Sequence, residues 1–142
     1  KSMANEFARN IQDASLNPAT FTLPSAEGLS VTSAAIDLGT DTFKPENLEV
    51  ELSIPALSST IAPSTATAGV TFIVEASTTS TFAAIARTVV SKNIAGTASG
   101  IGAQLLRTRV PSDCERYIRG KVTFGSTTTT ASALAATVTL RF

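Results

Sequence analysis

Two carboxylates on one face of a predicted strand are the residues of this chain best placed for chemistry. Glu49 and Glu51 are separated by one residue in the run LEVELSIP, and side chains two positions apart on a strand share a face. Such a pair can share a proton in acid–base catalysis or supply oxygen ligands to calcium. Calcium takes roughly six to eight oxygens, and one carboxylate pair supplies too few of them. We therefore interpret the pair as the solvated acidic face of a half-buried strand.

Reactive groups are otherwise scarce. The chain has no histidine, and its single cysteine, Cys114, allows neither an internal disulfide nor a zinc-ligand spacing. We interpret Cys114 as a small turn residue. Gly96, Gly100 and Gly102 are followed by a predicted strand rather than a helix, which does not fit a dinucleotide-binding loop. The sequence therefore predicts no enzyme, no catalytic residue, no cofactor and no metal site.

The composition suits a subunit of an assembly. The chain has 142 residues, the size of one domain, and only 15% of them are charged, against about 25% in an average soluble domain. Its formal net charge is +0 at pH 7. A surface so poor in charge limits the solubility of a protein that stays alone. The alternative is a small soluble β domain with a threonine-rich surface.

Charge is distributed unevenly along the chain. Residues 1–75 carry nine acidic and three basic residues, whereas residues 76–142 carry two acidic and eight basic ones. This segregation could serve a partner, or strands from the two halves could interleave so that the charges pair within the fold. Both interpretations stay open. No basic block indicates nucleic acid, and no window approaches the ~18 apolar residues of a membrane span.

Short alternating strands predict an all-β fold. The clearest alternation runs over residues 48–54, where Leu48, Val50, Leu52 and Ile54 oppose the polar positions. Further strands are predicted at 30–38, 70–77, 82–90, 105–124 and 134–142, separated by loops at 56–69 and 91–102. Seven or eight such strands with Gly, Pro, Ser and Thr turns indicate an antiparallel β-sandwich of jelly-roll type, which we assign to residues 29–142.

Residues 1–28 differ from the rest and are predicted to be an N-terminal arm. Met3, Phe7 and Ile11 recur at every fourth position and would form one narrow apolar stripe if the segment were helical. A stripe this narrow needs a surface to lie on. The segment is either an arm that contacts a neighbouring subunit or a helix that plugs the end of its own domain.

The region from Leu105 to Phe124 is predicted to form a hairpin with a turn at Pro111. Period-two alternation in its second run places apolar side chains on one face and basic ones on the other. In the first run, Leu105 shares a face with the arginines. The basic residues of the two runs are candidates for polar contacts with a neighbour, or for a solvated and internally paired face: Arg107, Arg109, Arg119 and Lys121.

The same region resembles a known family. The run RVPSDCERYIRG, with Arg109-Val110-Pro111 followed by Glu115 to Arg119, is similar to the C-terminal half of the small capsid cement proteins of tailed phages, typified by the Bordetella phage cement protein. Ile36 to Gly39 resembles the family's Ile-Asp-Leu-Gly, and residues 70–77 resemble the strand before its Ser/Thr loop. The similar segments cover a little over half the chain. The longer N-terminal arm and the 56–69 loop depart from the family's pattern.

The resemblance implies a jelly-roll-like fold and trimers seated on the outer capsid surface. A structural cement protein that clamps neighbouring major capsid subunits is therefore expected, with the major capsid protein and further copies of itself as partners. We expect it on the virion after assembly in the host cytoplasm, with no nucleic acid, membrane or small-molecule substrate. The alternative is a carbohydrate-binding module of a phage fibre or spike, but sugar sites usually present aromatic platforms and this chain has no Trp and one Tyr.

Overall fold

The described residues form nine strands and contain no helix. The computed structural model describes residues 18–40, 44–61, 69–95, 99–125 and 133–141. The strands are β1 (Ala19–Thr22), β2 (Ser30–Thr32), β3 (Ile36–Asp37), β4 (Glu49–Ile54), β5 (Val70–Ser77), β6 (Arg87–Ile94), β7 (Gln104–Arg109), β8 (Tyr117–Phe124) and β9 (Ala135–Arg141). No helix of the length and apolar character that a membrane crossing needs was found among these residues.

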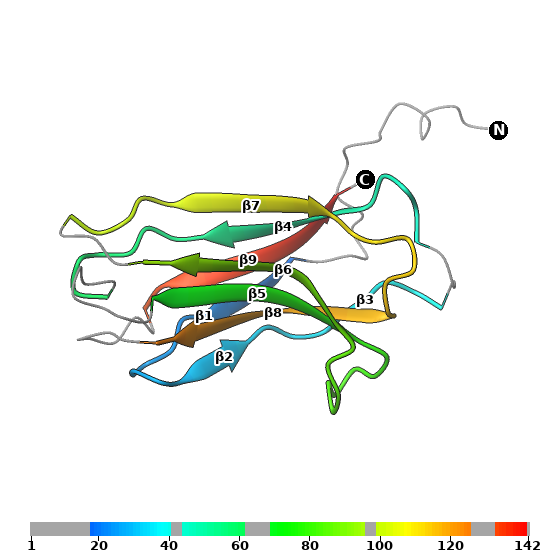
Figure 1. The fold of residues 1–142 in the computed structure, drawn as a ribbon, viewed down its shortest axis with the longest axis horizontal. Helices are drawn as coiled ribbons and strands as arrows, with labels where there is room; N and C mark the ends of the chain where they lie inside the picture. The colour runs from blue at the N-terminus through cyan, green and yellow to red at the C-terminus, as the bar shows by residue number, and fades with distance from the viewer. Residues whose placement is uncertain (1–17, 41–43, 62–68, 96–98, 126–132, 142) are drawn as a thin grey trace.

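The strands form two antiparallel sheets that lie one behind the other (Figure 1). Sheet A has the order β1-β9-β4-β7, and sheet B has the order β2-β8-β5-β6, with β3 also paired to β8. Among the connections, only β5 to β6 joins two strands that pair with each other. The predicted all-β sandwich of two antiparallel sheets is confirmed, whereas its jelly-roll connectivity stays a prediction.

Alternation explains why each strand buries one face. In β8 every second residue is buried: Ile118, Gly120, Val122 and Phe124. In β4 the inward residues are Val50, Leu52 and Ile54. Apolar side chains from both sheets form one core cluster, in which Phe72 and Leu52 are 0% exposed. Burying each such side chain contributes about 2 kcal/mol, so the facing apolar stripes hold the sheets together.

Gly120 lets the two sheets approach each other closely. A Cβ placed on it would lie 2.6 Å from Cγ2 of Val138 and 2.7 Å from Cε1 of Phe21, both on sheet A. The ring of Phe21 therefore occupies the space that a side chain on β8 would need. Glycine is required here for room rather than for backbone conformation.

The predicted arm overlaps the first strand. Residues 19–22 form β1, which pairs with β9 along the edge of sheet A, with Phe21 buried in the core. The expected boundary between residues 28 and 29 thus falls between β1 and β2. Met3, Phe7 and Ile11 lie outside the described residues.

The prediction of a hairpin at residues 105–124 is wrong. Strand β7 pairs with β4 in sheet A, whereas β8 pairs with β5, β2 and β3 in sheet B. The connection over 110–116 crosses from one sheet to the other. The segment before β4 holds it in place, because the amide of Lys44 donates to the carbonyl of Ser112 at 2.7 Å. Cys114 is buried within this connection, and burial raises the pKa of its thiol to about 11.

Two other predicted strands are corrected. The strand expected at 82–90 begins only at Arg87 and continues to Ile94, which is buried opposite Val70 in the ladder. Phe82 instead packs on the outer face of sheet B, so its apolar character does not mark a strand position. The strand expected at 30–38 is split into β2 and β3.

Candidate interaction surface

Glu51 is held by two arginines on the outer face of sheet A. Its carboxylate accepts from Nη2 of Arg107 at 2.6 Å and from Nε of Arg141 at 2.8 Å. Strand β4 lies between β7 and β9, so one guanidinium arrives from each side, and they leave Glu51 only 6% exposed. Hydrogen bonds from Arg141 and then Arg107 lower the pKa of Glu51 despite this burial.

The carboxylate pair considered for catalysis or calcium is therefore engaged by cations. Glu49 also faces Arg107, whose Nε lies 3.8 Å from its Oε2. Among the described residues, no three of the types His, Cys, Asp and Glu gather in a way that could hold a metal ion. This cluster fixes the outer face of β4 to its two neighbouring strands.

A second buried carboxylate lies on the outer face of sheet B. Glu75 is 4% exposed and accepts from Nε of Arg119, its register partner on β8, at 2.6 Å. The guanidinium of Arg119 also stacks over the ring of Phe82, 4.2 Å from the ring centroid. Arg119, one of the predicted contact residues, is thus used within the fold.

Ion pairs within the fold join part of the unevenly distributed charge. Acids of the first half pair with bases of the second: Glu49 and Glu51 with Arg107, Glu51 with Arg141, Asp37 with Arg116, and Glu75 with Arg119. Interleaving of the two halves in both sheets brings these residues together. Of the two interpretations left open by the sequence, pairing within the fold accounts for four of the nine acidic residues of 1–75 and four of the eight basic residues of 76–142.

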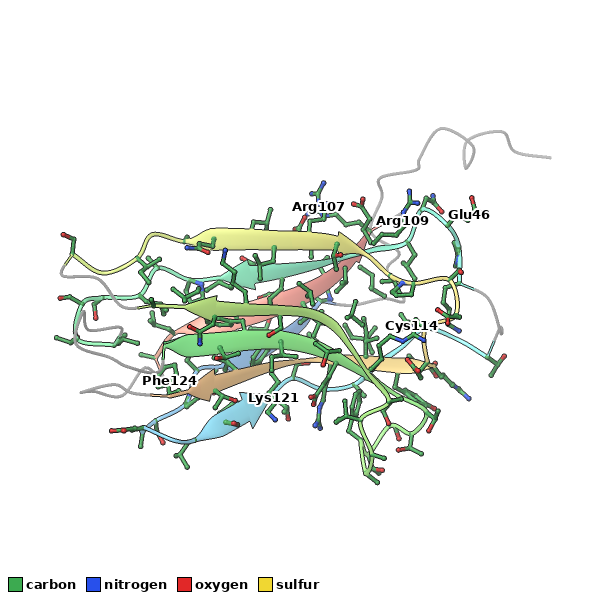
Figure 2. The ribbon with its side chains drawn as sticks, in the orientation of Figure 1. Glu46, Arg107, Arg109, Cys114, Lys121 and Phe124 are labelled. Atoms are coloured by element: carbon green, nitrogen blue, oxygen red, sulfur yellow. The ribbon has the colours of Figure 1, made fainter. Side chains whose placement is uncertain are left out.

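Arg109 stands apart from the other arginines. Five of the six arginines in the described part of the chain pair with a carboxylate, namely Arg87, Arg107, Arg116, Arg119 and Arg141. Arg109 is exposed and has no ion pair or hydrogen bond from its side chain among the described residues. It borders a hollow of about 310 Å³ that is also lined by Glu46, Val110, Pro111 and Ser112. Figure 2 shows Arg109 and Glu46 at the same end of the molecule.

The strand that carries Arg109 is the last described strand at one edge of sheet A. The amide of Val110 donates to the carbonyl of Leu48 at 2.9 Å, on the β4 side. Backbone amides alternate between the two edges of a strand, so those of Leu105, Arg107 and Arg109 face the edge that no described strand covers. Leu105 is 56% exposed, the highest value among the exposed large hydrophobic residues of the described chain.

We call this region the β7 surface. It comprises Leu105, Arg107 and Arg109 at alternate positions of the edge strand, together with the residues that line the hollow. Within the described part of the chain, the surface combines an exposed apolar side chain, a guanidinium without an ion pair and backbone groups that no strand pairs. An exposed strand edge is able to pair with the backbone of another protein chain, and the side chains beside it add selectivity.

The four basic residues predicted as contacts are split between two surfaces. Arg107 and Arg109 lie on β7, whereas Arg119 and Lys121 lie on β8 in the other sheet. Figure 2 shows Lys121 on the side of the molecule away from Arg107 and Arg109. Lys121 is half-buried and has no ion pair among the described residues.

Comparison with known proteins identifies the family. Residues 25–138 match the Bbp16 family. The chain belongs to this family. The family name suggests a Bordetella phage protein, which agrees with the resemblance found in the sequence. No curated protein matches the chain.

The region matched to the Bbp16 family contains most of the sandwich and the whole of the β7 surface. Sequence reasoning found the two arginines of this surface but missed Leu105 and Glu46 as parts of it. A signal for Leu105 was present, since this apolar residue shares a strand face with two arginines. Nothing in the sequence indicated Glu46 as part of this surface, because it lies in a loop more than sixty positions before Arg109.

Proposed function

We propose that this Bbp16-family protein is a structural cement protein that binds the outer surface of a phage head and clamps neighbouring major capsid subunits. The observation that carries the proposal is the β7 surface, where an exposed leucine and a guanidinium without an ion pair in the described part of the chain lie on an edge that no described strand covers. Membership of a phage family supports it. The function involves no reaction and no cofactor.

The chemistry of the outer faces supports a binding role. Most charged groups of the sandwich are already satisfied by one another, which leaves few sites where a partner would gain from a polar contact. Three interactions at the β7 surface would contribute to the binding free energy of a partner: burial of Leu105, a charge-assisted hydrogen bond to Arg109, and backbone pairing along the edge. Binding by area and hydrogen bonds needs no reactive group.

The proposed partners are the major capsid protein and further copies of this chain, as a homotrimer. The location is the outer surface of the virion, reached by assembly in the host cytoplasm. Neither nucleic acid, nor a membrane, nor a small-molecule substrate is part of this function. A sugar-binding function has less support, because the guanidinium of Arg116 lies 5.0 Å from the ring centroid of Tyr117 and that ring is half-buried.

Heat resistance of the capsid tests the proposal. Capsids stripped of the protein are mixed with the purified chain, and the temperature at which packaged DNA becomes accessible to a dye is compared with that of stripped and untreated capsids. Restoration of the untreated value is expected. Stripped capsids that are as heat resistant as untreated ones, or that gain nothing from the added chain, would contradict a cement function.

A further inference from the structure

The connection between β5 and β6 presents an uncharged apolar surface. It spans residues 78–86, with the sequence TTSTFAAIA, and contains no charged residue. Ala83, Ala84, Ile85 and Ala86 are all exposed, and Ile85 is 45% exposed. Four consecutive exposed apolar residues are unusual on a protein surface and indicate a contact site.

This 78–86 loop is fixed by hydrogen bonds at its base. The hydroxyl of Ser77 donates to the carbonyl of Ala84 at 2.8 Å and accepts from the amide of Thr79 at 3.2 Å. The amide of Ala86 donates to the carbonyl of Ala76 at 3.0 Å. Ser77 is 0% exposed, so these bonds are shielded from water. The apolar run is therefore held in one conformation before any partner binds.

Phe82 anchors the loop at the cost of backbone strain. Its φ is 53°, in the left-handed region that bulky side chains rarely adopt, yet the side chain is 7% exposed beneath the loop. Arg119 lies over its ring, and Glu75 holds Arg119 in place. Strain of this kind persists only where the surroundings impose it, and it concentrates at functional segments.

We propose that the 78–86 loop is a preformed docking element that inserts Ile85 and its flanking alanines into an uncharged apolar hollow on a neighbouring capsid subunit. A protein hollow fits best, because the loop offers no cation for a phosphate and no exposed aromatic ring for a sugar. Arg87, at the end of the loop, is paired with Asp113 at 2.7 Å. Small side chains on both sides of Ile85 allow a close approach.

The inference deepens the proposed function and rests on it. The loop lies over sheet B, whereas the β7 surface belongs to sheet A, and Figure 1 shows the β5–β6 connection projecting at the lower right, away from β7 at the upper edge. Two contacts on different sides of one molecule are what a clamp between two subunits requires. Prior ordering of the loop reduces the entropy lost on binding.

The test compares full-length Ile85→Ser with a matched control, Leu29→Ser, in quantitative binding to stripped capsids. Leu29 is 49% exposed and lies before β2, outside both contact surfaces. Ile85→Ser is expected to lower the affinity about tenfold, as the loss of one buried aliphatic side chain does. Leu29→Ser is expected to bind as the wild type does, and both variants are expected to keep the wild-type melting temperature.

A second variant tests the ordering of the loop separately from the contact that Ile85 makes. Ser77→Ala removes the hydrogen bond to Ala84 and leaves Ile85 in place, and it is expected to weaken binding severalfold while hydrogen exchange of the Ala86 amide accelerates. Equal binding by wild type, Ile85→Ser and Ser77→Ala would overturn the inference alone. Absence of wild-type binding would overturn the proposed function and the inference with it.

Discussion

Glu51 and Arg107 lie directly opposite each other in the register of β4 and β7, with 2.6 Å between the carboxylate and the guanidinium. This pair commits Arg107 to the sandwich. Arg109, two positions further along the same strand, lies opposite Glu49 in the ladder but makes no ion pair with it among the described residues. The difference between these two arginines defines which part of β7 is available to a partner.

Glu51→Gln is expected to destabilise the fold by about 1 to 2 kcal/mol, because two guanidiniums lose their charged acceptor. Urea unfolding measures the change. Glu49→Gln is the control, since its contact to Arg107 is 3.8 Å long and its side chain is 40% exposed, and a change below about 0.5 kcal/mol is expected. Equal losses for the two variants would show that the double arginine contact does not stabilise β4.

Acid is expected to destabilise the protein through its paired carboxylates. Hydrogen bonds from Arg116, and then from the amide of Gly39, lower the pKa of Asp37 from 3.8 to about 2, and arginines also lower the pKa values of Glu51 and Asp113. A lowered pKa in the folded state means that the unfolded state binds more protons, so stability is present above the unfolded values and is lost below them.

The melting temperature should therefore be flat above about pH 5 and fall between pH 4.5, the ordinary value for Glu, and about 2. Scanning calorimetry across this range measures the slope. Asp37→Asn should start from a lower melting temperature and show a shallower decline. A wild-type profile that does not change down to pH 2 would contradict the lowered pKa values.

Alternation of apolar and polar residues predicted strands well where the two faces of a strand differ in polarity. Residues 48–54 and the second half of the 105–124 region lie in β4 and β8 as expected. Alternation says nothing about which strand pairs with which, so two neighbouring runs were assigned to one hairpin. The partners of β7 and β8 are set by long-range packing, including the contact of Gly120 with Phe21 and Val138.

The candidate site was predicted only in part for the same reason. Whether an arginine is free depends on which carboxylate lies opposite it, and Glu75 lies 44 positions before Arg119. Arg109 could be named from the sequence as a basic residue on a strand face, but its lack of a partner could not. The strain at Phe82 had no sequence signal, because phenylalanine is common in strands and a strand was predicted there.

Gly120→Ala is expected to cost about 1 to 3 kcal/mol, because the new methyl group would overlap Phe21 and Val138 across the sandwich. Gly102→Ala is the control, since nothing lies within 4 Å of a Cβ at that position. Thermal unfolding of the two variants measures the difference. A Gly120→Ala protein as stable as the control would mean that the sheets are further apart at this point.

Cys114 is expected to resist alkylation in the native protein. The thiol is 4% exposed, and burial, followed by the neighbouring charge of Glu115, raises its pKa from 9.0 to about 11, which lowers the thiolate fraction about a hundredfold. Iodoacetamide labelling at pH 8, followed by mass spectrometry, should be slow in buffer and rapid in urea. Equal rates in the two conditions would contradict the burial of Cys114.

The most direct test of the account is co-sedimentation of the full-length chain with stripped capsids across a range of concentrations, using wild type, Arg109→Gln and Lys121→Gln. A cement protein that binds through the β7 surface should saturate the capsid at a fixed ratio, lose about tenfold in affinity with Arg109→Gln, and bind normally with Lys121→Gln. Saturation by all three proteins at the same affinity would show that Arg109 of the β7 surface does not contribute to capsid binding. No sedimentation of the wild type with capsids would contradict the cement function itself.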